Sequence, residues 1–531
     1  MKFDNILSEI GGVGKFQIRL ILIQVISRIT VPCHFLLNNF MAGVPSHHCN
    51  ISTLDNFNIS NLTLQQKLST GIPTEMDGSL SSCLMFSKPR HPHLLNISEE
   101  SSIVQCQNGW VYDKSDFKST LATEWDLVCS RKGMNKATAT IFFIGVMLGA
   151  PLFGYLSDRF GRRRLLLVSY LTTMTFAVLS ALSTSYVMFG VMRFFTGMSI
   201  SAISIVSIVL TLEWLGAEQR TLFGLIFSLD WSLGNCVLVA MAYMVNEWRL
   251  LILAVTSPLI LALVAWRWLP ESGRWLVANG KFDDAYYYIN QCAEMNNRCK
   301  CMATITPRTL LESVDADTAD KKYTVIDLFK TATLRKLGVC LGIVWFGVAF
   351  TYYGIILNIT GFGLNLYLTH FLFTSIEMPM KIALYFLLEN IGRRLVQAGA
   401  LLSTGLCLFI NMFVSKEKWI IRTIVGVLGK SMSEASFTVI FFFTIELYPT
   451  VIRQNGVGYT SFVARLAVSI SPLIMLLEDV WRFLPPMIYC GMAILSGLVA
   501  LLLTETRNTR MPEFIEDIDK PREKITRGKT I

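Results

Sequence analysis

The chain is poor in charged residues. Of its 531 residues only 16% are Asp, Glu, Lys or Arg, whereas 52% are hydrophobic and the mean hydropathy is +0.48. A soluble protein carries about 25% charged residues. The apolar excess is larger than one globular core can bury, so most of it must face lipid.

Sequence motifs for catalysis, nucleotide binding and metal binding are also missing. No H-E-x-x-H or G-x-S-x-G sequence occurs, and the run Gly11-Gly12-Val13-Gly14-Lys15-Phe16 lacks the spacing and the Ser/Thr of a phosphate-binding loop. Cys292, Cys299 and Cys301 have no His or second Cys pair nearby, and a structural zinc site needs four ligands. We interpret them as reduced thiols, with zinc as the alternative, and expect no enzyme activity, no cofactor and no metal.

What is abundant is long apolar stretches. A membrane-spanning helix needs roughly 20 mainly apolar residues, and about twelve stretches of that kind occur. No cleavable signal is evident, because the first stretch is too long for the apolar part of a signal peptide. The expected spans are 17–41, 134–156, 165–185, 187–212, 219–244, 249–269, 338–358, 366–388, 395–414, 418–446, 453–477 and 482–504.

The short loops predict the orientation. Arg159 and residues 162–164 crowd one connection, and Arg393 and Arg394 crowd a later one, while alternate loops such as 359–365 contain no Lys or Arg. Positive loops stay in the cytoplasm. This topology explains the net charge of +9 better than nucleic-acid binding does, so we expect the lipid bilayer, and no nucleic acid, as a partner.

The same topology divides the chain into two six-helix halves joined by a polar loop that we expect to carry short amphipathic helices. The expected segments are a cytoplasmic N-terminus (1–16), an N-terminal half (17–269, with an extracellular loop at 43–133), a cytoplasmic loop (270–337), a C-terminal half (338–504) and a cytoplasmic tail (505–531).

Two features agree with an extracellular position for the loop 43–133. It carries four N-x-S/T glycan acceptors, namely Asn50, Asn58, Asn61 and Asn96. It also carries an even number of cysteines suited to two disulfides in an oxidising compartment, namely Cys49, Cys83, Cys106 and Cys129. Three pairings of these cysteines are open.

Landmarks of the first half recur in the second. Gly161-Arg162-Arg163 returns as Gly392-Arg393-Arg394, Glu213 with Arg220 returns as Glu446 with Arg453, and 270–274 has a partner at 504–507, each at an offset of roughly 232 residues. Internal repetition of this kind is typical of two-halved transporters, whose substrate site lies between the halves.

We interpret the repeated charges as conformational latches at the cytoplasmic side, the alternative being simple anchors on the positive side of the membrane. The latch residues are Asp158, Arg159, Arg162, Arg163, Glu213, Arg220, Glu271, Arg274, Glu389, Arg393, Arg394, Glu446 and Arg453.

The run 154–163 resembles the G-x-L-x-D-R-x-G-R-R motif of the major facilitator superfamily. The large first loop, together with 119–129 and 446–454, is similar to the organic ion transporter family within it. Residues 351–354, 361–363 and 429–430 resemble its organic anion branch, and 433–437 and 34–37 are most like the organic anion transporter 2 group. Thr504 departs from the Pro usual in the family's last motif.

This resemblance implies an all-α membrane protein with the major facilitator fold, twelve transmembrane helices in two six-helix halves and a glycosylated extracellular loop between helices 1 and 2. It implies transport of small organic anions across the plasma membrane by alternating access, facilitative or driven by exchange, with a dicarboxylate as the counter-ion suggested by analogy. The alternative is a polyspecific carrier of organic cations or zwitterions. The acidic residues Asp230 and Glu434 inside the spans support this alternative.

Charged residues inside the spans are expensive and usually functional. Glu377 with Lys381, and Lys430 with Glu434, are four residues apart, so each pair is expected to neutralise itself on its own helix. Arg193 and Asp230 have no such neighbour. We expect a structural role for Arg193, and for Asp230 either a pairing with Arg193 or a part in accepting cations.

Arg465 is the strongest candidate for substrate binding, because a guanidinium matches a carboxylate and related cation carriers have an acidic residue here. The alternative is permanent pairing with Asp230 or Glu434. Positional likeness adds further substrate-binding candidates, whose alternatives are core packing, lipid contact or helix–helix hydrogen bonding. They are Lys381, Tyr352, Tyr353, Phe437, Phe441, Asn39 and His34.

Overall fold

The structure is a computed structural model. It describes Leu7, Ile10 and residues 14–518, apart from 53–62, 76–77, 88–101, 116, 217–219, 299–324, 358–364, 416–417, 450–451, 508–511 and 513–514. Three of the four expected glycan acceptors, Asn58, Asn61 and Asn96, therefore lie outside the described residues, as do Cys299 and Cys301.

The N-terminal half begins with a span broken into three short helices, and its sixth span is broken at Pro258. Its elements are α2 (Lys15–Arg28), α3 (Thr30–Leu36), α4 (Asn38–Met41), α7 (Lys132–Phe160), α8 (Arg162–Ala181), α9 (Tyr186–Glu213), α10 (Arg220–Met244), α11 (Trp248–Thr256), α12 (Pro258–Ala265) and the 3₁₀ turn η4 (Trp266–Trp268).

The C-terminal half follows two short helices, α13 (Gly273–Ala278) and α14 (Phe282–Met295), and the turn η6 (Val325–Phe329), and its first span is a single helix. Its spans are α16 (Ala332–Ile356), α17 (Leu366–Asn390), α18 (Arg393–Phe413), α19 (Trp419–Leu447), α20 (Arg453–Ile474) with η8 (Met475–Asp479), and α21 (Leu484–Ala500). A last turn, η9 (Ile515–Ile518), follows.

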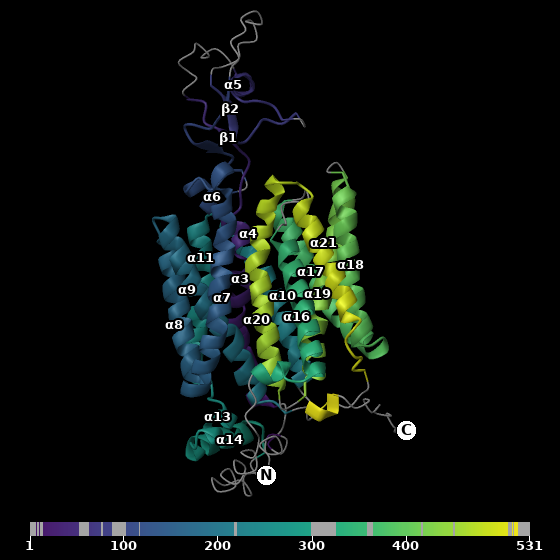
Figure 1. Ribbon diagram of the computed structural model, residues 1–531. Coiled ribbons are helices and arrows are strands. Elements are labelled where there is room, and N and C mark those ends of the chain that lie inside the picture. The colour runs from purple at the N-terminus through teal and green to yellow at the C-terminus, as the bar shows by residue number, and fades with distance from the viewer. Residues whose placement is uncertain are drawn as a thin grey trace, which may run out of the picture.

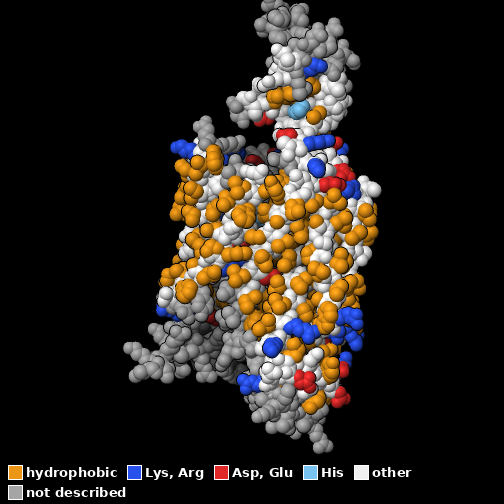
Figure 2. All heavy atoms as spheres, turned by 180° about the vertical axis from the view of Figure 1, so that it is seen from behind, with side chains coloured by type: hydrophobic (Ala, Val, Ile, Leu, Met, Phe, Trp, Pro, Cys, Tyr) orange, Lys and Arg blue, Asp and Glu red, His pale blue; other side chains and the backbone are white. Residues whose placement is uncertain are grey.

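Eleven helices among the described residues are long and apolar enough to cross a membrane, and the twelfth expected span corresponds to the shorter apolar helix α21. In Figure 1 the N-terminal half forms one side of the helical bundle and the C-terminal half the other. The halves meet along α7 with α20 and along α10 with α17. Seen from behind, hydrophobic side chains cover the middle of the bundle, whereas Lys and Arg gather at its rims (Figure 2).

Glycines allow neighbouring helices to approach closely within the N-terminal half. A Cβ on Gly145 of α7 would lie 2.1 Å from the carbonyl oxygen of Phe194 on α9. Likewise, a Cβ on Gly197 of α9 would lie 2.2 Å from the carbonyl oxygen of Phe142 on α7. Any larger residue at either position would push α7 and α9 apart.

The described parts of the loop 43–133, which we expect to be extracellular, form a small domain at one end of the bundle (Figure 1). It contains α5 (Leu64–Gly71), α6 (Leu121–Glu124) and two antiparallel ribbons, β1 (His47–Cys49) with β4 (Trp110–Tyr112) and β2 (Leu84–Phe86) with β3 (Ile103–Gln105). The open question of pairing is answered: Cys49 bonds to Cys106, and Cys83 to Cys129.

Candidate functional site

Aromatic side chains from both halves meet at the centre of the bundle. Tyr352 and Tyr353 of α16 are only 2% and 4% exposed. The ring of Tyr353 lies 5.2 Å from that of Phe143 on α7, and the ring of Tyr352 lies 5.4 Å from that of Phe437 on α19. Three of the expected aromatic residues therefore form one cluster at the boundary between the halves.

Trp231 and Phe35 extend this central aromatic cluster on the side of the N-terminal half. The indole N–H of Trp231 donates to the Tyr352 hydroxyl at 3.4 Å, and the Trp231 ring lies 5.5 Å from Phe35. Sequence reasoning missed Trp231, Phe35 and Phe143, because aromatic residues are too frequent in the spans to be sorted by position. The one available signal was the position of Trp231 next to a charged residue in mid-span.

Phe441 lies away from the central aromatic cluster. It is 44% exposed, and its ring contact is with the neighbouring Phe442 at 6.0 Å. Although it is four residues from Phe437 on the same helix, only Phe437 reaches Tyr352 in this conformation.

Arg465 projects from α20, is half-buried, and lies close enough to Tyr353 for a direct electrostatic interaction. Among the residues that the structure describes, no side chain forms a hydrogen bond or an ion pair with its guanidinium. The alternative expectation, permanent pairing with Asp230 or Glu434, is not met, because both carboxylates have other partners.

The charges on α17 and α19 form a buried four-charge cluster, made of Glu377, Lys381, Lys430 and Glu434. Lys430 lies 2.6 Å from Glu377 and Lys381 lies 2.9 Å from Glu434. The same-helix distances are longer, 4.0 Å for Glu377 to Lys381 and 3.7 Å for Lys430 to Glu434. Both expected same-helix ion pairs are therefore present, but the shortest contacts cross between helices, so the four charges neutralise one another as a group.

Lys381 is fully engaged by this cluster and by the other half. Its ammonium donates to the Ser232 hydroxyl and to the Ser228 carbonyl oxygen of α10, both at 2.8 Å. With Glu434 as the third partner, all three of its N–H bonds are used. A direct contact between Lys381 and a substrate would require one of these bonds to break.

The remaining charged pair in the N-terminal half was not the expected one. Asp230 accepts from Nε of Arg28 at 2.9 Å, and both side chains are buried. Arg193 instead hydrogen-bonds the ring Nδ1 and the carbonyl oxygen of His34, at 3.1 and 3.3 Å, and stacks over Phe142. The expected pair of Asp230 with Arg193 is therefore replaced by Asp230 with Arg28.

His34 and Asn39, two substrate-binding candidates of the first span, are held by protein contacts. His34 is completely buried and also contacts the Thr256 hydroxyl at 3.1 Å. Asn39 donates to the carbonyl oxygen of Ile356 at 2.9 Å, across the boundary between the halves.

At the end that carries the loop 43–133, side chains join the two halves. Besides the Asn39 contact, Phe40 stacks on Tyr367 of α17 at 5.6 Å, and Lys132 at the start of α7 pairs with Asp479 after α20. Figure 2 shows the surface hollowed toward the opposite, Arg-rich end.

The repeated charges form two cytoplasmic braces with the same geometry. In the first, Arg162 pairs with Asp158 at 2.8 Å and with Glu213 at 3.0 Å, while Glu271 Oε1 accepts from the backbone N–H groups of Arg162 and Arg163 at 2.9 and 3.1 Å.

In the second brace, Arg393 pairs with Glu446 at 3.1 Å, and Glu505 accepts from the backbone N–H groups of Arg393 and Arg394, both at 3.0 Å. The ion pairs of both braces, as far as the described residues extend, join elements of one half. The side chains of Arg220 and Glu389 lie outside the described residues.

The other latch candidates flank these braces. Arg163 donates to the Tyr288 hydroxyl of α14 at 3.0 Å, Arg274 acts electrostatically on Glu213, and Arg159 stacks on Phe160. Arg453 donates to the carbonyl oxygen of Tyr448 at 3.3 Å. The candidates thus gather at the Arg-rich end, around the two braces.

Comparison with known proteins matches residues 110–516 to the sugar (and other) transporter family. The chain is 42% identical to solute carrier family 22 member 7 of Mus musculus, over 100% of this chain and 99% of the relative, and 42% identical to its Homo sapiens counterpart, over 98% and 96%. It is 36% identical to member 6 of Danio rerio, over 98% and 94%.

Among solved structures, the chain superposes on the partially occluded inward open conformation of the xylose transporter XylE from E. coli with a TM-score of 0.63. The match covers 92% of this chain and 98% of that one, at 15% identity. At this identity the likeness concerns the fold alone.

Proposed function

Because the chain belongs to solute carrier family 22, within the sugar (and other) transporter family, we propose that it carries small organic anions across the plasma membrane, with Arg465 as the anion anchor. The protein is a multi-pass membrane transporter with the major facilitator fold and not an enzyme. Alternating access moves the two halves about the central aromatic cluster.

The observation that carries the proposal is the unpaired guanidinium of Arg465. Of the five basic residues noted inside the spans, Arg28, Lys381 and Lys430 have carboxylate partners, and Arg193 has His34 and the Phe142 ring. Of these five, as far as the described residues extend, Arg465 alone has neither kind of partner. A buried charge without a partner is costly, and a substrate carboxylate would supply the missing one.

The central aromatic cluster supports an aromatic or otherwise flat anion. Tyr353 lies beside Arg465, so a bound carboxylate at Arg465 would place the rest of the substrate against the rings of Tyr353 and Phe143. Flat faces with tolerant stacking geometry accept varied ring systems. Substrate contacts by Lys381, Asn39, His34 and Phe441 remain predictions, each requiring a rearrangement of the present contacts.

The observed ion pairs weaken the alternative proposal of a cation or zwitterion carrier. It relied on Asp230 and Glu434, and both carboxylates already neutralise buried cations, Arg28 for the first and Lys381 for the second. Two glutamates and two lysines balance in the four-charge cluster. Of the charges inside the spans discussed above, Arg193 and Arg465 are left without a carboxylate partner among the described residues, so the excess charge at the centre of the bundle is positive.

Exchange for a dicarboxylate counter-ion is the finer part of the proposal and rests on family analogy. Since each cytoplasmic brace joins elements of one half, we expect the braces to keep the halves rigid while they rock. Preloading cells with glutarate should raise the rate of anion uptake if the exchange holds.

The test measures uptake of labelled para-aminohippurate, cyclic GMP, orotate and tetraethylammonium by cells that express the wild type or Arg465→Asp. We expect anion uptake by the wild type and a loss of about tenfold or more in the variant, the value of a charge-assisted hydrogen bond. Arg465→Lys keeps the charge but not the planar fork, so it should retain part of the activity.

Arg335→Asp is the matched control, because this arginine lies exposed at the cytoplasmic start of α16. Surface protein is quantified by biotinylation for every variant. Undiminished anion uptake by Arg465→Asp would remove Arg465 from the site, and uptake of tetraethylammonium alone would overturn the proposal of an anion carrier.

A further inference from the structure

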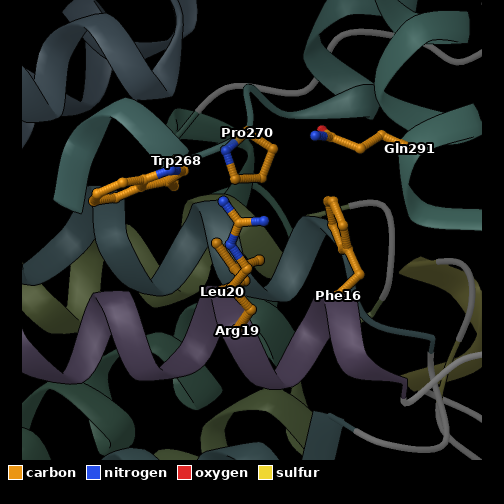
Figure 3. A pocket seen from close by; sticks show the side chains of 6 residues that line it. All are labelled: Phe16, Arg19, Leu20, Trp268, Pro270 and Gln291. Carbon is orange, nitrogen blue, oxygen red and sulfur yellow. The ribbon is translucent and has the colours of Figure 1, made fainter. Parts of the chain in front are cut away.

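A pocket outside the transport path lies at the Arg-rich end of the N-terminal half (Figure 3). It is lined by Phe16, Arg19, Leu20, Trp268, Pro270 and Gln291. These residues come from the first half of α2, from η4 with the chain just after it, and from α14. Its cavity volume is about 10 Å³, room for about one water-sized group, so the pocket admits only the tip of a larger ligand, such as a phosphate oxygen, while the rest lies outside.

The walls of this pocket are fixed to one another. Asn296, just after α14, accepts from the backbone N–H of Phe16 at 3.1 Å and donates to Gln17 at 3.0 Å. The Phe16 ring also packs on Trp214 at 4.9 Å. Because these contacts hold the start of α2 against α14, the pocket is a formed feature of the folded protein.

Two polar side chains point into the pocket without strong partners. In Figure 3 the guanidinium of Arg19 lies at its centre, and the amide of Gln291 points toward it. Among the described residues, the hydrogen-bond partner of Arg19 is the thioether sulfur of Met295 at 3.9 Å, a weak acceptor. Glu294, an acid of α14, instead accepts from Asn290 at 2.6 Å.

A second cation strengthens the positive charge at this site. Lys15 is exposed and lies four residues before Arg19, so the two cations share one face of α2. Like charges at this spacing repel each other. A bound anion between them would remove the repulsion and supply strong hydrogen-bond acceptors, which Arg19 and Gln291 do not have among the described residues.

The surroundings are those of a membrane–water interface. Trp268 is 57% exposed, as is typical of an aromatic residue at the headgroup level. Leu22, three residues after Arg19 on the same face of α2, is 61% exposed and faces the lipid. A ligand at this pocket would therefore place a charged group at Arg19 and an apolar chain along Leu22.

We propose that this pocket binds the phosphate-bearing headgroup of an anionic lipid of the cytoplasmic leaflet, with Arg19 as the principal phosphate ligand and Gln291 as a second donor. Basic pockets of membrane proteins on the cytoplasmic side are suited to such headgroups. A lipid bound there would bridge α2 and α14 and so hold the cytoplasmic helices to the N-terminal half.

The test uses the purified full-length protein and native mass spectrometry with phosphatidylinositol phosphate, with phosphatidylcholine as the neutral comparison. We expect the wild type to retain the phosphorylated lipid selectively. Arg19→Gln should lower its affinity about fivefold, the value of one cation near a lipid surface. Gln291→Leu, which changes no charge and lies on α14, should also weaken binding.

Arg335→Gln is the matched control, since it removes an exposed cation at the same end of the other half and should leave lipid binding unchanged. Equal losses for Arg19→Gln and Arg335→Gln would mean unspecific attraction and overturn the proposal. Equal retention of phosphatidylcholine would do the same. Displacement by inorganic phosphate alone would show a soluble phosphate as the ligand instead.

Lipid binding is measured without transport, so its result does not depend on whether Arg465 binds the substrate. A bound ligand stabilises the folded state. The lipid should therefore raise the unfolding temperature of the wild type and of Arg335→Gln, but not that of Arg19→Gln, whose unfolding temperature without lipid serves as the folding control.

Discussion

The ammonium of Lys430 lies 2.6 Å from the carboxylate of Glu377, which belongs to a different helix. Glu434, four residues along the same helix as Lys430, is farther away at 3.7 Å. The contact with Glu377 therefore fastens α17 to α19, and through Ser232, which donates to Glu377 at 3.0 Å, it also reaches α10 of the other half.

This relationship predicts strong coupling between the two residues. Glu377→Gln leaves a buried ammonium without its nearest carboxylate, at a cost of about 3–5 kcal/mol in folding free energy. The double change Glu377→Gln with Lys430→Gln should cost less than the sum of the single changes. Thermal unfolding of the purified proteins measures this. Additive effects in the double-mutant cycle would contradict the pairing.

Because Asp230 pairs with Arg28, we expect that replacing Asp230 lowers the stability of the protein but does not change whether it prefers anions or cations. Asp230→Asn leaves Arg28 buried and unpaired, so surface abundance should fall. The anion-to-cation uptake ratio of the protein that reaches the surface should stay as in the wild type. Adding Arg28→Gln should restore part of the abundance. Acquired or lost cation uptake in Asp230→Asn would show instead that Asp230 contacts the substrate.

The two Gly-Arg-Arg turns predict matched effects in both halves. Gly161 and Gly392 have φ of +100° and +103°, and an added Cβ would lie 2.6 Å from Glu271 and 2.8 Å from Glu505. Gly161→Ala and Gly392→Ala should each lower stability by about 1–3 kcal/mol, as seen in thermal unfolding. Gly399→Ala in α18 is the control, because its Cβ meets nothing within 4 Å.

Cys292 of α14 predicts an unreactive thiol. Burial raises the pKa of this thiol to about 12, and the thiolate is the reactive form. At pH 8 only about 1 in 10,000 molecules would carry the thiolate. A charged maleimide should therefore leave Cys292 unmodified in the folded protein and modify it after denaturation. Rapid labelling of the folded protein would refute the buried position.

The sequence predicted the membrane architecture well, because that architecture depends on local features. Apolar length specifies a span, whereas the orientation that the Arg-rich loops predict stays a prediction. The repeat also anticipated that Glu271 and Glu505 are equivalent, and each now accepts from the two N–H groups that open the helix after a Gly-Arg-Arg turn.

The central site was only partly predictable from the sequence. Tyr352, Tyr353 and Phe437 were found through positional likeness to a family, whereas Phe35, Phe143 and Trp231 carry no local signal that separates them from other apolar side chains. The disulfide pairing was open for the same reason, since each bond closes a loop of dozens of residues, with separations of 57 and 46.

By itself, then, the sequence determined a two-halved membrane carrier, with repeated charges at one end and a cysteine-paired loop at the other. Only the tertiary structure decided which charges neutralise each other. Spacing along a helix identifies neighbours on that helix, but buried partners such as Lys430 and Glu377 depend on how two helices are rotated and packed. In that packing Asp230 pairs with Arg28 and Glu434 pairs with Lys381. Arg465 lies beside Tyr353, where it can bind an anion.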